Sequence, residues 1–135
     1  MKENVTLTIT SLLTILFVTF HISDEITRGM EPGRLNMVIP ILVLAGWLYG
    51  ALVLSGRRSG YIIMLLGAIV GTGIPIVHMA GVGLVGGRIA NSRGAFFWVW
   101  QNFTLCVISA CSVILAVRGL WSLRQSRTRS SSPQT

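Results

Sequence analysis

The sequence predicts an all-α protein, a four-helix antiparallel transmembrane bundle, and two observations support this fold class. The first is composition: 52% of the 135 residues are hydrophobic, only 11% are charged, and the mean hydropathy is +0.71. Soluble globular domains carry roughly 25% charged residues, so the composition argues against a soluble enzyme, a nucleic-acid-binding domain and a disordered chain. The second is charge spacing. Four stretches of at least 20 residues carry no formal charge: 4–23, 35–56, 59–87 and 94–117.

These stretches predict membrane spans at about 5–23, 35–55, 60–81 and 95–117. A helix that crosses a bilayer needs about 20 apolar residues, and a helix satisfies its own backbone hydrogen bonds in hydrocarbon. The first span is interpreted as a retained helix, because the residues that follow it offer no small-residue cleavage site for a signal peptidase. The short link between the second and third spans makes them an antiparallel hairpin.

Basic residues predict the orientation of the chain. Seven of the 11 lie on the N-terminal stub, the second loop and the C-terminal segment, and four lie on the first and third loops. Because basic residues concentrate on the cytoplasmic side, we expect both termini in the cytoplasm and the chain in the inner or plasma membrane. Segment 118–135 mixes arginine with serine, threonine and proline, and is expected to be a basic disordered tail. The net charge is +7, and we expect the basic residues that produce it to contact the head groups of the lipid bilayer. No nucleic acid is expected as a partner.

Glycines four residues apart are expected to pack the helices together. The pairs are Gly46 with Gly50 in the second span, and Gly67 with Gly71 in the third. Small residues at this spacing let helix backbones approach closely within a membrane. We expect Gly67 and Gly71 to contact another helix of the same chain. The alternative is a face for a second copy or for another membrane protein.

One side of the first span collects polar side chains. At about 100° per residue, seven polar positions fall within one arc of about 100°, whereas Ser11 falls outside it. A helix surrounded by lipid has no reason to gather polar groups on one face, so we expect this face to point into the bundle. The seven positions are Thr6, Thr10, Thr14, His21, Asp24, Glu25 and Arg28.

Three polar residues of other spans are expected at the depth of His21. His78 lies near the outer end of the third span, and Gln101 and Asn102 lie about two turns into the fourth. Ionisable groups inside a membrane are costly and mark candidate functional sites. The candidate ligand or relay residues are His21, Asp24, Glu25, Arg28, His78, Gln101 and Asn102. An interfacial aromatic belt is expected at the start of the fourth span, from Phe96, Phe97, Trp98 and Trp100.

The sequence leaves three interpretations of this constellation open. In the first, His21 and His78 bind a metal ion or haem, with Asp24 as third ligand or as the carboxylate that orients a histidine. In the second, His21 titrates against Asp24 in a proton relay or a pocket for a small polar ligand. In the third, the residues only pack: His21 caps its helix, Asp24 pairs with Arg28, and His78 bonds a carbonyl group freed by Pro75. No cofactor is required by the sequence.

Residues 21–29, His-Ile-Ser-Asp-Glu-Ile-Thr-Arg-Gly, resemble the first-loop segment of small uncharacterised bacterial four-pass integral membrane proteins. The resemblance implies a bacterial multi-pass membrane protein and no activity. No serine or cysteine has a base at helical spacing, so we do not expect an enzyme. We expect an accessory or interaction protein packed through small-residue helix faces. The alternatives are the ligand or relay site at the outer end, and a subunit of an oligomeric small transporter or channel.

Overall fold

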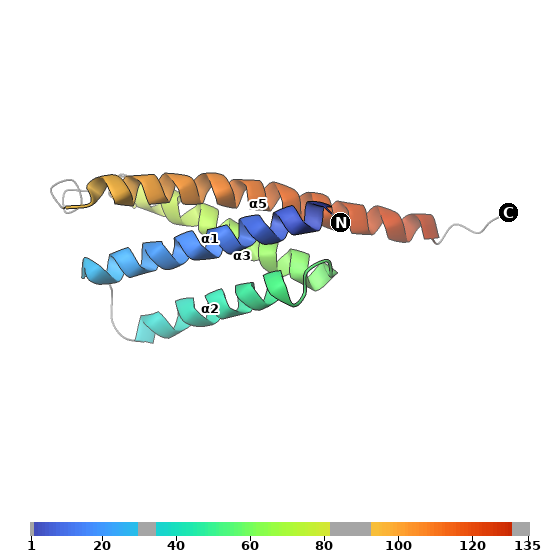
Figure 1. The fold of residues 1–135 in the computed structure, drawn as a ribbon, viewed down its shortest axis with the longest axis horizontal. Helices are drawn as coiled ribbons and strands as arrows, with labels where there is room; N and C mark the ends of the chain where they lie inside the picture. The colour runs from blue at the N-terminus through green and yellow to red at the C-terminus, as the bar shows by residue number, and fades with distance from the viewer. Residues whose placement is uncertain (1, 30–34, 82–92, 131–135) are drawn as a thin grey trace.

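The computed structural model describes residues 2–29, 35–81 and 93–130 and shows an all-α bundle (Figure 1). Within these residues the chain forms four helices and no strand. The helices are α1 (Lys2–Thr27), α2 (Leu35–Leu52), α3 (Arg58–Gly81) and α5 (Ala95–Ser130). The predicted fold class is thereby confirmed.

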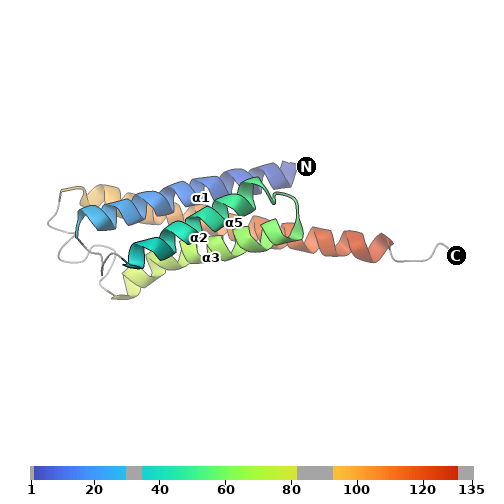
Figure 2. The same ribbon diagram turned by 90° about the horizontal axis from the view of Figure 1, so that it is seen from below.

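Successive helices run in opposite directions, so both ends of the chain lie toward the same end of the bundle (Figures 1 and 2). The turn after α2 contains Gly56 at a φ of 79°, a left-handed conformation that glycine adopts without strain. α5 is the longest helix and projects beyond the other three (Figure 1). We call the end where α1 and α3 finish the histidine end, and the opposite end, which holds both termini, the terminal end.

Three of the helices are long and apolar enough to cross a membrane. The candidate spans are Asn4–Thr27, Arg58–His78 and Ala95–Ser126. α2 contributes a shorter apolar stretch, Val38–Leu52. These lengths and compositions indicate a membrane protein with several embedded helices, and the fourth span at 35–55 stays a prediction.

Buried positions recur every three or four residues along each long helix. On α1 they are Leu7, Ser11, Thr14, Val18 and His21. This spacing is that of helices that pack side by side along a continuous seam. The same spacing on the other two helices gives Tyr61, Met64, Ala68, Gly71 and Pro75 on α3, and Trp98, Gln101, Leu105, Ser109, Ser112 and Ala116 on α5.

The buried face of α1 is rotated from the predicted one. Measured from Thr6 at about 100° per residue, the buried residues lie at about 60–140°, whereas the predicted polar arc covers about 0–100°. Ser11, which was expected outside the polar face, is completely buried, and Thr6 is exposed. The rotation is roughly 50°. It brings Glu25 to the middle of the buried face and leaves Asp24 about 60° outside it.

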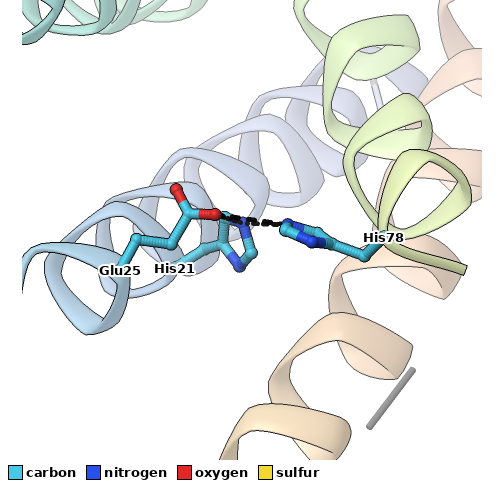
Figure 3. A group of neighbouring side chains, drawn as sticks. All are labelled: His21, Glu25 and His78. Carbon is cyan, nitrogen blue, oxygen red and sulfur yellow. Dashed lines mark hydrogen bonds and ion pairs between the residues drawn. The ribbon is translucent and has the colours of Figure 1, made fainter. Parts of the chain in front are cut away.

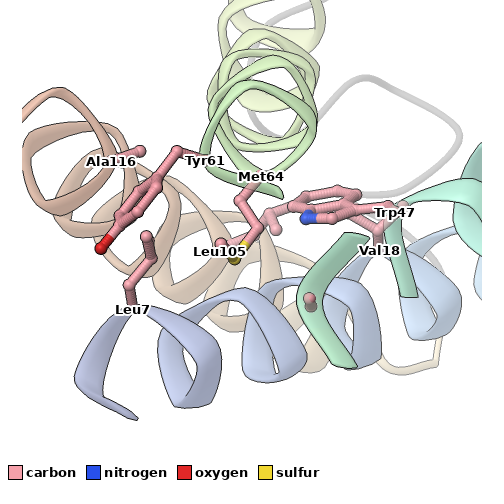
Figure 4. Packing of buried hydrophobic residues seen from close by; sticks show 8 residues of the cluster. Leu7, Val18, Trp47, Tyr61, Met64, Leu105 and Ala116 are labelled. Atoms are coloured by element: carbon pink, nitrogen blue, oxygen red, sulfur yellow. The ribbon is translucent and has the colours of Figure 1, made fainter. Parts of the chain in front are cut away.

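The apolar core joins all four helices (Figure 4). Trp47, which is 2% exposed, is the large side chain through which α2 enters it. Toward the terminal end, the Tyr61 hydroxyl donates a hydrogen bond to Oδ1 of Asn4 and so ties α3 to α1. The buried core residues are Leu7, Val18, Trp47, Ala51, Tyr61, Met64, Leu105 and Ala116.

Gly67 and Gly71 make contacts within the chain rather than a dimer face. A Cβ added at Gly67 would overlap the ring of Trp47 from α2. A Cβ added at Gly71 would lie 2.6 Å from Oγ of Ser109 and 2.9 Å from Cγ2 of Thr14. The two glycines therefore let α3 approach α2 on one side, and α1 and α5 on the other.

The second glycine pair behaves differently at its two positions. A Cβ added at Gly50 would lie 2.5 Å from Cγ2 of Ile63, so this glycine also admits α3. Gly46 is exposed and has nothing within 4 Å of an added Cβ. The packing role expected for Gly46 is therefore not found among the described residues, because α2 turns the neighbouring Trp47 toward α3 instead.

α5 continues through much of the segment that was expected to be disordered. Residues 118–130 are helical, whereas 131–135 lie outside the described residues. After Gly119 there is no glycine, and no proline before Pro133, while arginine, leucine and glutamine favour helix. The hydroxyl groups of Ser126 and Thr128 bond carbonyl groups of the preceding turn. The serine and threonine content therefore does not end the helix.

Candidate metal centre at the histidine end

Three ionisable side chains from two helices meet at the histidine end (Figure 3). His21 and Glu25 lie one turn apart on the same face of α1, and His78 lies near the end of α3. α1 and α3 both run toward this end, so residues near their last turns share one depth. Among the residues that the structure describes, these three form the group suited to hold a metal ion.

The three contacting atoms form a nearly regular triangle. Nε2 of His21 lies 3.0 Å from Nε2 of His78. Oε1 of Glu25 lies 3.4 Å from Nε2 of His21 and 3.3 Å from Nε2 of His78. Ligand atoms about 2.0–2.1 Å from a tetrahedral zinc ion are roughly 3.3 Å apart. The triangle therefore has the size of one face of a zinc coordination tetrahedron.

His21 is the centre of the group. It is 2% exposed, and its ring contacts that of His78 edge-to-face, with centroids 4.9 Å apart. Its other ring nitrogen, Nδ1, lies 3.3 Å from Nε2 of Gln101 on α5. Both ring nitrogens of His21 therefore have partners. Nε2 contacts α1 and α3, and Nδ1 contacts α5.

Trp98 of α5 supports the ring of His78, a role that the sequence analysis missed. The two rings meet edge-to-face with centroids 5.4 Å apart, and Trp98 is 1% exposed. Trp98 is therefore buried, whereas Phe96 and Trp100 are exposed, and the interfacial aromatic belt stays a prediction. The available signal was spacing: Trp98 lies three residues before Gln101 and so shares its face of the helix.

Asp24 is not part of the group, although it was the carboxylate expected there. Its Oδ2 accepts a hydrogen bond of 2.7 Å from Nε of Arg28. Arg28 also reaches the carbonyl group of Gly94 beside α5, at 3.4 Å. The Asp24–Arg28 pair is thus the contact that the packing interpretation predicted. Glu25 takes the place expected for Asp24, because the buried face of α1 centres on Glu25.

Asn102 lies beside the group without contacting a histidine. Its Nδ2 donates a hydrogen bond of 2.9 Å to the carbonyl group of Trp98, and its Oδ1 has no partner. The structure therefore brings four of the seven candidate residues together and leaves three apart. The four are His21, Glu25, His78 and Gln101, and the three are Asp24, Arg28 and Asn102.

The interior of the bundle also holds buried polar atoms of α1 and α5 without hydrogen-bond partners in the described part of the chain. They are the side-chain oxygens of Ser11, Gln101, Asn102 and Ser109. A buried polar group without a partner costs about 1–3 kcal/mol, and such places commonly hold water. Buried polar atoms are therefore not confined to the three ionisable side chains.

The three side chains differ in exposure. The side chain of His21 is 3% exposed, that of His78 is 18% exposed and that of Glu25 is 30% exposed. His21 is therefore the buried member of the group, and Glu25 and His78 are its partly exposed members.

The ligand chemistry of the group is well defined. Two imidazoles and one carboxylate form the protein ligands of zinc sites that keep a fourth position open, and of non-haem iron sites. Haem fits poorly, because two axial nitrogens on opposite sides of an iron atom are about 4 Å apart, whereas these lie 3.0 Å apart.

No family model, no curated protein and no solved structure matches this chain. The site itself therefore carries the functional argument, and the resemblance of residues 21–29 stays a prediction.

Proposed function

We propose that this membrane protein binds one divalent transition-metal ion, with zinc as the first candidate, through His21, Glu25 and His78. The observation that carries the proposal is the triangle of two Nε2 atoms and one carboxylate oxygen with sides of 3.0–3.4 Å. Its members come from two helices and are up to 57 residues apart in the chain. The fourth ligand would be water or a ligand from outside the bundle, since Glu25 and His78 are partly exposed.

With two neutral imidazoles and an ionised carboxylate, hydrogen bonds can occupy at most two of the three sides of this triangle. An imidazole Nε2 carries either one hydrogen or one lone pair, and an ionised carboxylate oxygen only accepts. If His21 carries its hydrogen on Nε2, it can donate to His78 or to Glu25, but the remaining side of the triangle then sets two lone pairs 3.3 Å apart. If both histidines carry hydrogen there, two hydrogens face each other across 3.0 Å. A cation in contact with all three atoms accepts every lone pair at once.

Gln101 can serve both the metal-free and the metal-bound state. As placed, its Nε2 donates to Nδ1 of His21, and its Oε1 is buried without a partner. When Nε2 of His21 binds a metal, the ring hydrogen moves to Nδ1 and needs an acceptor. Rotation of the amide by half a turn presents Oε1 to that hydrogen. Gln101 would thus hold His21 in the tautomer that binds metal.

The geometry favours a metal site over the other two proposed functions. An interaction protein packed through small residues needs an open glycine face, but Gly67 and Gly71 are covered inside the chain, and Gly46 alone of the four is open. An oligomeric transporter predicts polar groups at a subunit interface, whereas His21 and Gln101 are buried within one chain.

The metal content of the purified protein tests the proposal. Protein in detergent, stripped by a chelator, dialysed against zinc and measured by elemental analysis, is expected to hold one zinc ion per chain. A matched variant with Cys106→Ser and Cys111→Ser, the two free cysteines, is expected to hold the same amount, since neither belongs to the triangle. Retention of less than about one ion per ten chains would contradict the proposal.

A proton relay is the second candidate, favoured by the direct contact of His21 with His78 beside a carboxylate. The same measurement separates the two functions, because a relay retains no metal. A relay would also move protons through protein reconstituted in vesicles after chelation of every divalent ion.

We propose further that both termini face the cytoplasm, so that the metal centre opens on the opposite side of the membrane. Both termini lie at one end of the bundle (Figure 2), and the basic residues concentrate there. Alkaline phosphatase fused after residue 135 is expected to be inactive in bacterial cells, and a fluorescent protein fused there is expected to fluoresce. An active phosphatase fusion would reverse the proposed orientation.

A further inference from the structure

A second candidate site lies at the terminal end, remote from the histidines. It is a cavity of about 1110 Å³ between the turn that precedes α3 and the last third of α5. Gly119 fits against the ring of Tyr61 and brings the two helices together. Beyond that contact α3 has begun at Arg58 while α5 continues to Ser130, so the projecting part of α5 forms one wall of the cavity.

The polar side of this cavity is strongly basic. Arg57, Arg58 and Arg124 line it, and all three are exposed. Among the side chains that the structure describes, no carboxylate lies within ion-pair distance of them. Of the four acidic residues, Glu3 is the one that the chain places at this end, and its side chain lies outside the described residues. The cavity is therefore complementary to an anion.

The other side of the cavity is apolar. Ile62 and Val117 line it at 40% and 45% exposure, Ile62 about one turn deeper than Arg58 on α3 and Val117 about two turns deeper than Arg124 on α5. Trp121, also in the lining, is 67% exposed between the apolar and the basic residues. Tryptophan prefers the boundary between head groups and hydrocarbon. The lining is therefore basic at one level and apolar at the next, in the same order as the charged head group and the acyl chains of a phospholipid.

We infer that this cavity binds an anionic phospholipid. The phosphate group would contact Arg57, Arg58 and Arg124, and an acyl chain would lie along Ile62 and Val117. Basic pockets between membrane helices are established binding places for anionic head groups. A free phosphate ion shares the head-group chemistry but makes no use of the apolar lining, which is why a lipid is the occupant that fits.

Native mass spectrometry of the full chain in detergent tests this inference, with bound phosphatidylglycerol counted against bound phosphatidylcholine. Phosphatidylglycerol is expected to bind more tightly than phosphatidylcholine. The double variant Arg57→Gln/Arg124→Gln is expected to weaken it roughly 30-fold, or about fivefold for each arginine lost. The matched control Arg93→Gln/Arg118→Gln removes the same charge from exposed arginines that are absent from the cavity lining, and is expected to bind as the original chain does. All four arginines are exposed, so helix content by circular dichroism should stay unchanged.

The other outcomes overturn the inference. Equal weakening by both double variants would mean that net charge, rather than this cavity, attracts the lipid. Equal binding of phosphatidylcholine would mean that the arginines do not select the head group. Displacement of phosphatidylglycerol by inorganic phosphate, lost in the Arg57→Gln/Arg124→Gln variant, would assign the cavity to a soluble anion instead.

Discussion

Replacing His21 by alanine is expected to lower zinc affinity by roughly 10²–10³-fold. Structural zinc sites with four ligands bind with about 10–16 kcal/mol, so one ligand contributes roughly 3–4 kcal/mol. His21 is the buried member of the group, and its loss also leaves Glu25 and His78 without their common neighbour. Isothermal titration of the detergent-solubilised protein with zinc measures the change. The matched control is Asp24→Asn, which removes the adjacent carboxylate that bonds Arg28 and should leave zinc affinity within about twofold.

Two substitutions at Gln101 separate a metal centre from simple packing. Gln101→Leu removes the partner of Nδ1 and is expected to weaken zinc binding by about 10–100-fold. Gln101→Glu keeps an acceptor for the Nδ1 hydrogen of metal-bound His21 but removes the donor that metal-free His21 uses. Zinc affinity should therefore survive in Gln101→Glu while the stability of the metal-free protein falls, since a buried carboxylate without a partner is costly. Equal loss of zinc binding in both variants, or in Asp24→Asn, would contradict the assignment of these roles.

The sequence predicted the position of the site along the bundle but not its carboxylate. Depth follows from the alternating direction of the helices, which is why His21, His78 and Gln101 meet as expected. Rotation of a helix about its axis is harder to predict when apolar residues surround it. The threonines of α1 were an incomplete guide, because their hydroxyl groups bond carbonyl groups of their own helix whether the residue is buried, as Thr14 is, or exposed, as Thr19 is. A threonine satisfied in this way can face lipid, so polarity alone does not mark the inner face.

Leu7 and Val18 indicate which face of α1 is buried. Both belong to the apolar core, and their positions on the helix wheel lie near that of Glu25 rather than that of Asp24. Counting Leu7 and Val18 together with Ser11, Thr14 and His21 gives the repeat of three and four residues that the structure shows. In sequence, these apolar residues could not be told from the many that face lipid. Their burial depends on partners from other helices, which a single helix does not encode.

Gly67→Ala is expected to destabilise the bundle although alanine is the better helix former. A Cβ at this position would overlap the ring of Trp47, which is 2% exposed and has little room to move. Inserting a methyl group into a well-packed interior typically costs about 1–3 kcal/mol, which outweighs a gain of up to about 1 kcal/mol from helix propensity. Gly67→Leu should be worse, because it has to push α2 away from α3. Unfolding by sodium dodecyl sulfate, followed by circular dichroism, measures the change in the free energy of unfolding.

Gly46→Ala is the matched control, since it makes the same substitution one residue before Trp47 in a position with open space around it. It is expected to leave the free energy of unfolding unchanged, or to raise it by up to about 1 kcal/mol through helix propensity. Gly67→Ala should therefore lower the free energy of unfolding, whereas Gly46→Ala should not lower it. A destabilised Gly46→Ala would mean that a second copy or another protein covers this face of α2, and would restore the small-residue contact first expected there. A stable Gly67→Ala would mean that Trp47 does not hold α2 against α3.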